Sequence, residues 1–334
     1  MACKLQKEDP SAIEGTTLFS TSNCNGRPIG VYLPKTHNFT SGALDIVIWL
    51  HGYFIKGQKE LLTEDNLKSA PDQKIELRQQ VKDSGKDVVL VAPFFAYGDN
   101  EDSRAYWGAV NTLATKGWGE TFLDELLLAL KPHHKTATDL SINRLFIACH
   151  SGGGVAMRKL VDTLGKHTDK LTQCWGFDCL YSATYDRKNL PLGNDAQPAL
   201  FWIRKLRGGA KFSLHIVAGA GTSDESLHLF LMGRGWVDEK GYKLSPPGQS
   251  LPTTALSVIV ETTDLFTALS AGQASPDDVA VSEPDLPGPV KGDRVFVRQV
   301  AAKLATAGHG FPKGNKYHFD LARLGLAKRL KLLP

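Results

Sequence analysis

The sequence predicts an α/β fold, in which a mostly parallel, eight-stranded sheet is covered by helices on both faces. Short apolar runs alternate with helical patterns along the 334 residues, an order that favours parallel strands joined by crossover helices. Several runs are almost continuously apolar, as expected for strands buried on both faces. Between residues 145 and 154, an apolar run ends in a serine and three glycines before a helical pattern. This segment predicts a sharp strand–turn–helix.

Eight segments are predicted as strands, and the first two are joined by an Asn- and Gly-containing turn at 23–26, which predicts an antiparallel start to the sheet. The strand ranges are 16–20, 28–33, 45–50, 87–92, 143–148, 172–180, 212–218 and 255–260. The helical patterns cover 61–81, 122–130, 157–164, 228–232 and 318–332. We expect a single domain over 1–334, with a candidate lid at 186–207 and a long Pro-rich loop at 262–291.

Composition limits the classes of partner. The net charge is +4, from 39 basic and 35 acidic residues, so a nucleic-acid partner is not expected. No apolar run is long enough to predict a transmembrane helix. The first ten residues are polar and lack the apolar core of a signal peptide. The sequence therefore predicts a cytoplasmic location, unless a leader has been removed.

The five cysteines are odd in number and include no C-x-x-C pair. This count predicts neither a disulfide framework nor a zinc site. Cys149, Cys174 and Cys179 fall in or beside apolar runs, and we expect them to be buried as small hydrophobic residues.

Ser151 is the candidate nucleophile because it follows a predicted strand directly and precedes a glycine-rich helix start, the layout of a nucleophile elbow. The alternative role is a helix N-cap, which serine often fills. Cys149 occupies a position where the G-x-S-x-G pattern has glycine. A cysteine nucleophile at Cys149 is a weaker hypothesis, since its sulfur should be buried at the end of the strand.

A serine hydroxyl needs a base, and the base needs a carboxylate to orient it. Asp178, at the end of an apolar strand, is the favoured acid, and Asp224, in the loop after the next strand, is its rival. His318, which directly precedes an amphipathic helix, is the favoured base. His309, in a glycine-flanked loop, is the alternative.

These pieces resemble an α/β-hydrolase: Leu50-His51-Gly52 after the third strand, the Ser151 turn, a following acid and a late histidine, in the order Ser, Asp, His. The segments at 89–93, 122–125, 150–153 and 177–181 are also similar to a little-characterised bacterial branch with a Ser-Gly-Gly elbow and an Asp-x-Leu-Tyr segment. That second resemblance names no substrate.

The resemblance implies a serine hydrolase, and by fold-level analogy a carboxylic ester hydrolase acting on a small-molecule or lipid-like ester. The backbone N–H groups of Gly152 and Tyr53 are the expected oxyanion donors. His51 is expected to shape that loop and, with His150 and Trp107, to lie at the substrate pocket. No metal or organic cofactor is implied. An amidase or peptidase with the same triad, and a non-catalytic binding protein, remain alternatives, and the oligomeric state is not predicted.

Overall fold

The computed structural model describes residues 2–7, 13–52, 62, 75–96, 104–136, 138–177, 179, 212–218, 262–263, 295–300 and 316–333. For residues 213, 215–218, 262–263, 295–300, 316–321 and 324, the backbone alone is described. The candidate lid at 186–207, the Pro-rich loop from 264 to 291, and the predicted helix at 228–232 lie outside these residues.

A ten-stranded mixed sheet organises the chain, in the order β1-β2-β3-β5-β4-β6-β7-β8-β10-β9. Strands β1, β2, β3 and β5 pair antiparallel, and the pairs from β5–β4 to β10–β9 are all parallel. The strands are β1 (Lys4–Lys7), β2 (Gly15–Ser22), β3 (Ile29–Pro34), β4 (Ala43–Leu50), β5 (Val89–Pro93), β6 (Ser141–His150), β7 (Leu171–Phe177), β8 (Ser213–Ala218), β9 (Thr262–Thr263) and β10 (Val295–Val300).

The predicted mostly parallel sheet with an antiparallel start is confirmed, but the expected strand number of eight is too low. Edge strand β1 and the two-residue β9 are additional. The predicted strand at 255–260 lies outside the described residues. Instead, β10 pairs with β8, and its sequence at 295–300 follows the predicted Pro-rich loop at 262–291.

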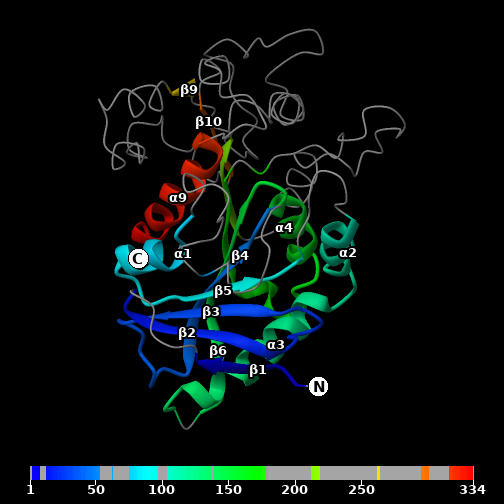
Figure 1. Cartoon of the computed structure of the whole chain (residues 1–334), viewed down its shortest axis with the longest axis vertical. Helices are drawn as coiled ribbons and strands as arrows, with labels where there is room; N and C mark the ends of the chain where they lie inside the picture. Colours follow the sequence, from blue (N-terminus) through cyan, green and yellow to red (C-terminus); the bar gives the residue numbers. More distant parts are fainter. Residues whose placement is uncertain are drawn as a thin grey trace.

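Helices cover both faces of the sheet, as Figure 1 shows. One face carries α1 (Leu77–Ser84) and α9 (Lys316–Lys331). The other carries α2 (Arg104–Thr112), α3 (Trp118–Leu130) and α4 (Gly153–Val161). Two short 3-10 helices, η3 (Lys131–His133) and η4 (Gly165–Lys170), precede β6 and β7.

Side chains that alternate along the strands divide between two hydrophobic cores. In β4, Ile46, Ile48 and Leu50 belong to the core beneath α2, α3 and α4. Val47 and Trp49 belong to the core beneath α1 and α9. All five are buried, with at most 2% of each exposed. This period of two fits a sheet covered on both faces.

Helix α9 is fixed to the sheet and to α1 by two close contacts. The Gln80 side chain donates to the Ala322 carbonyl at 3.0 Å and accepts from the Ala327 N–H at 3.0 Å. At Gly325, an added Cβ would lie 2.3 Å from a ring carbon of Phe177. Because Phe177 is the last residue of β7, the helix lies directly against the end of that strand.

The turn predicted at 23–26, between the first two predicted strands, is present and joins β2 to β3. A bridge joins Cys24 to Arg27, and Asn25 and Gly26 both have positive φ, at 43° and 81°. The turn is held by Glu125 of α3, whose carboxylate accepts the Asn25 N–H at 2.5 Å.

A disulfide joins Cys3 to Cys24, so the expectation that the cysteines form no disulfide is wrong for this pair. Five cysteines are compatible with one disulfide and three free thiols. The spacing of the cysteines does not indicate that β1 lies beside this turn. Cys149, Cys174 and Cys179 are free and buried, as expected.

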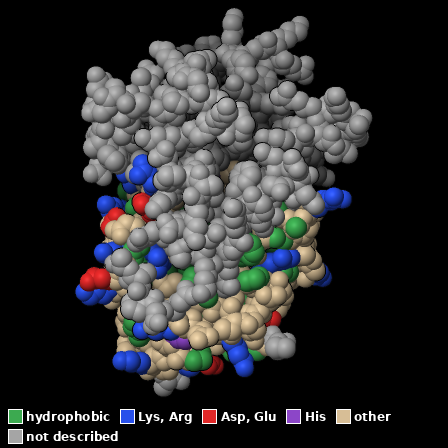
Figure 2. All heavy atoms as spheres, in the orientation of Figure 1, with side chains coloured by type: hydrophobic (Ala, Val, Ile, Leu, Met, Phe, Trp, Pro, Cys, Tyr) green, Lys and Arg blue, Asp and Glu red, His purple; other side chains and the backbone are tan. Residues whose placement is uncertain are grey.

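On the described part of the face in Figure 2, Lys and Arg side chains are spread along the edges, with Asp and Glu among them. This mixture fits the nearly balanced charge of the sequence. In the described residues, no helix combines the length and apolar character needed to cross a membrane.

Candidate active site

Ser151 stands at a strained turn between strand and helix. It follows β6 directly, and α4 begins two residues later. Its φ is 55°, a left-handed conformation that is uncommon for residues other than glycine. Its N–H donates to the Phe177 carbonyl at 3.2 Å, and its own carbonyl accepts from the Gly154 N–H at 3.1 Å. The backbone on both sides therefore holds the strained residue in place.

The three glycines after Ser151 allow close approach of α4 to the sheet. A Cβ at Gly153 would lie 2.1 Å from the Leu50 carbonyl oxygen. A Cβ at Gly154 would lie 2.2 Å from the Cys179 carbonyl oxygen. The first turn of α4 is thus wedged between the end of β4 and the residues that follow β7, where a larger side chain has no space.

Gly52, two residues beyond the end of the neighbouring strand β4, packs against Ser151. A Cβ at position 52 would be 2.7 Å from the Ser151 Cβ and 3.1 Å from its Oγ. The predicted proximity of the His51-Gly52 segment to the serine is therefore present in the structure. Tyr53, whose N–H is an expected oxyanion donor, lies outside the described residues.

His51 holds this segment in place through both of its ring nitrogens. Nε2 accepts the Phe95 N–H at 3.0 Å, so the proton is on Nδ1, which donates to the Gly52 carbonyl at 2.5 Å. The Tyr106 hydroxyl donates to the His51 carbonyl at 2.7 Å. The ring stacks on Phe94 and Phe95, with centroids 5.8 and 5.2 Å away.

Burial lowers the pKa of His51 to about 4, although the hydrogen bond to Gly52 opposes this shift. The imidazole is therefore neutral at pH 7 and, with both nitrogens engaged, has no capacity left to act as a base. These contacts favour the predicted role of His51 in shaping the loop over direct contact with substrate.

Most of the predicted acids and bases lie outside the residues that the structure describes. Asp178, Asp224 and His309 lie outside the described residues. The neighbours of Asp178 in the chain are Phe177, whose carbonyl accepts the Ser151 N–H, and Cys179, whose carbonyl oxygen would lie 2.2 Å from a Cβ at Gly154.

His318 lies within the described backbone. It is the third residue of α9, so it belongs to the first helical turn rather than preceding the helix as predicted. Gly325 is seven positions further along the helix, which places the two on one face of it, about 10 Å apart along its axis. In Figure 1, α9 runs from the end of the sheet beside β10 down to the C-terminus.

Cys149 is unsuited to nucleophilic chemistry. It is fully buried, and burial, together with a contact to Cys179, raises the pKa of its thiol well above the usual value. A thiol kept protonated is a poor nucleophile, and the sulfur is buried as expected.

The two other predicted pocket residues differ in exposure. His150 ends β6 and is 2% exposed. Trp107 of α2 is partly buried and meets Tyr106 edge to face, with centroids 5.3 Å apart.

Sequence reasoning did not find the role of Tyr106. Its hydroxyl reaches a carbonyl 55 residues away, and no periodic pattern signals such a contact. The two acids of 122–125, a segment that carries the second resemblance, make contacts away from Ser151: Asp124 pairs with Lys166 and His167 at 2.6 and 2.9 Å. Glu125 holds the turn at Asn25.

The strand order and the turn at Ser151 together decide the fold. The chain has an α/β-hydrolase fold. No family model matches the sequence, and a search of curated proteins gives no match.

Several solved structures of the α/β-hydrolase fold are similar to this chain. An S-formylglutathione hydrolase from Agrobacterium tumefaciens is 17% identical, covering 69% of this chain and 87% of its own, with a TM-score of 0.42. A dienelactone hydrolase-like promiscuous phosphotriesterase from metagenomic libraries is 12% identical over 99% of both chains, with a TM-score of 0.39. Esterase B from Lactobacillus rhamnosis is 11% identical, covering 98% of this chain and 87% of its own, with a TM-score of 0.35. Likenesses this distant say nothing about substrate.

Proposed function

We propose that this α/β-hydrolase-fold protein is a serine hydrolase that cleaves carboxylic esters, with Ser151 as its nucleophile. The observation that carries the proposal is the φ of 55° at Ser151, at the carboxyl end of a central parallel strand. Such a conformation costs about 1–3 kcal/mol and persists where the surrounding structure enforces it, often at active sites. In open α/β sheets, ligands bind outside the carboxyl ends of the strands.

The structure weakens the rival role of Ser151 as a helix cap. The N-cap of α4 is Gly152, and no side chain makes a cap hydrogen bond there. Ser151 is partly exposed whereas the glycines behind it are buried. A serine that merely ended the strand would gain nothing from the left-handed backbone, whereas a nucleophile gains an exposed hydroxyl.

In the proposed reaction, the base takes the Ser151 proton as Oγ attacks the ester carbonyl carbon. His318 is the proposed base and Asp178 the carboxylate that orients it. The tetrahedral intermediate collapses as the alkoxide leaves with the proton held by the imidazolium. Water then attacks the acyl-enzyme, again with base assistance, which releases the acid and regenerates the serine.

The N–H groups of Gly152 and Tyr53 are the proposed oxyanion donors. Support for the first is its place at the start of α4, where the first N–H groups have no acceptor within the helix. Support for the second is indirect. The residue before it, Gly52, packs on Ser151, and His51 fixes that residue through the Gly52 carbonyl.

The proposal is tested by hydrolysis of p-nitrophenyl esters of increasing acyl length. We expect Ser151→Ala to lower kcat/KM by about 10⁴-fold or more, while Ser41→Ala, at a partly buried serine of the β3–β4 connection, keeps the wild-type rate. The preferred acyl length measures the pocket.

The matching p-nitroanilides separate esterase from amidase activity. Anilide cleavage exceeding ester cleavage would replace the esterase proposal with the amidase alternative. Equal ester rates in wild type and Ser151→Ala would overturn the proposed nucleophile and favour a binding role.

A further inference from the structure

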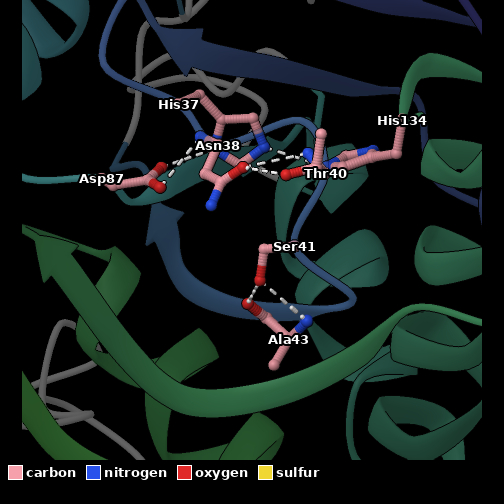
Figure 3. A network of polar contacts seen from close by, with 7 residues as sticks. All are labelled: His37, Asn38, Thr40, Ser41, Ala43, Asp87 and His134. Carbon is pink, nitrogen blue, oxygen red and sulfur yellow. Dashed lines mark hydrogen bonds and ion pairs between the residues drawn. The ribbon is translucent and has the colours of Figure 1, made fainter. Parts of the chain in front are cut away.

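A second cluster of polar side chains lies at the other end of the sheet, where the parallel strands begin. Figure 3 shows it between three connections: His37 follows β3, Asp87 precedes β5, and His134 follows η3. Ser151 stands at the carboxyl end of β6, whereas this cluster lies near its start. The proposed hydrolase chemistry makes no use of these residues.

The two imidazoles face one another through the same ring atom. His37 Nε2 and His134 Nε2 are 2.9 Å apart, and the rings meet edge to face at 90°. Each residue is 8% exposed. Two buried histidines thus direct their outer nitrogens at a common point.

The inner nitrogen of each ring is held by an oxygen. His37 Nδ1 is 2.5 Å from the Asp87 carboxylate, and His134 Nδ1 is 3.1 Å from the Leu130 carbonyl. The other Asp87 oxygen accepts the Asn38 N–H at 3.0 Å. The carboxylate and the carbonyl are both acceptors, so each Nδ1 faces an acceptor oxygen, and the two Nε2 atoms face one another at hydrogen-bonding distance.

This arrangement is the one that metal-binding histidines show. Such a histidine usually donates its other ring N–H to a carboxylate or a backbone carbonyl, which fixes the tautomer and the ring orientation. Here one histidine has the carboxylate and the other the carbonyl. Two imidazole ligands of a tetrahedral Zn²⁺ lie about 3.3 Å apart, so the 2.9 Å gap needs to open by about 0.4 Å, and the rings need to turn so that both Nε2 atoms point at one ion.

We propose that His37 and His134 bind one divalent transition-metal ion, of the kind that prefers imidazole, through their Nε2 atoms. The ion takes the place of the hydrogen bond between the two nitrogens, and the proton of that bond leaves to solvent. The described residues contain no group of three or more His, Cys, Asp or Glu suited to hold a metal, so the proposed site has two protein ligands among them, and water is proposed for the remaining positions. The negative charge of the Asp87 carboxylate offsets part of the positive charge of the ion.

Bound metal would act as a staple between the β3–β4 and η3–β6 connections. These already touch, because the Lys135 N–H donates to the Phe39 carbonyl at 2.8 Å and the Phe39 ring packs against both histidines. Zinc suits such a role because it is redox-inert and accepts tetrahedral nitrogen ligands. Copper binds the same ligand set more tightly.

The test is calorimetric titration of the full chain with ZnCl₂, supported by the electron paramagnetic resonance spectrum of one added equivalent of Cu²⁺. We expect one tight equivalent of Zn²⁺, two nitrogens in the copper spectrum and a rise in Tm with metal. His37→Ala and His134→Ala should lose all three. Asp87→Asn keeps both ligands and should weaken binding about 10–100-fold, which tests the site even if a histidine variant fails to fold.

His167→Gln is the matched control, since His167 also pairs with a carboxylate, at 2.9 Å from Asp124, but faces no second histidine in the described structure. It should bind like wild type, as should Ser151→Ala, so that failure of the hydrolase proposal leaves this result intact. If the wild type binds no tight equivalent of Zn²⁺, or if His134→Ala binds Zn²⁺ as the wild type does, the proposed metal site is wrong.

Discussion

Gly52 packs directly on Ser151, and a Cβ at position 52 would lie 2.7 Å from the Ser151 Cβ. The two residues are almost a hundred positions apart in the chain. They meet because β4 and β6 are neighbouring parallel strands, with Leu50 opposite Cys149. This contact brings the proposed oxyanion loop to the proposed nucleophile.

We predict that Gly52→Ala lowers kcat for ester hydrolysis by about 100-fold or more, because the added methyl displaces the Ser151 hydroxyl and small misplacements of reacting groups are costly. Steady-state kinetics measures the effect, and circular dichroism checks that the variant folds. Gly108→Ala is the control, since its Cβ would meet nothing within 4 Å. Wild-type kcat in Gly52→Ala would show that this contact does not position the nucleophile.

His51 should make folding stability depend on pH. Burial lowers its pKa from 6.5 to about 4. Between these values the unfolded chain takes up a proton that the folded chain does not, so stability falls as pH drops through that window. A shift of this size corresponds to about 3 kcal/mol in total, of which about 2 kcal/mol is lost between pH 7 and pH 5.

Urea unfolding at pH 7 and pH 5 measures this contribution when wild type is compared with His51→Gln. Glutamine offers an N–H for the Gly52 carbonyl and an oxygen for the Phe95 N–H, but it does not titrate. The variant should lose about 2 kcal/mol less than wild type on acidification. An identical pH dependence in both proteins would contradict the assignment of a buried neutral imidazole.

Gly325→Ala should disturb the site from a distance. The added methyl would lie 2.3 Å from the Phe177 ring, so α9 must shift away from β7. We predict a fall of about tenfold or more in kcat with little change in KM, because the shift moves the helix that carries His318. Phe177→Leu in the same chain should restore part of the rate by making room. No effect of Gly325→Ala on kcat would separate the position of α9 from catalysis.

Much of the fold could be predicted because its signals are local. The apolar runs at 45–50 and 143–148 are long enough to define buried strands, and the serine followed by glycines marks the turn. Strand β10 could not be found in this way, since its apolar run at 295–300 is short, is interrupted by Arg298 and Gln299, and follows a Pro-rich segment. The Cys3–Cys24 bond was missed because it depends on where β1 pairs, which no spacing rule gives.

The candidate nucleophile could be predicted from the sequence, but the hydrogen bonds that support the site could not. Ser151 could be singled out from the turn alone. The hydrogen bonds that fix His51 come from Phe95 and Tyr106, 44 and 55 residues away, and depend on packing between elements. The His37–His134 pair is equally non-local, since its members are 97 positions apart in the chain.

The most direct test of the central claim is labelling of the folded wild-type protein with a fluorophosphonate, followed by peptide mass spectrometry. An activated serine oxygen attacks phosphorus and expels fluoride, whereas an ordinary serine does not react. The account predicts one phosphonate per chain, on the peptide that contains Ser151, and no adduct in Ser151→Ala. An unmodified Ser151 in folded protein, or an adduct on another residue, would contradict it.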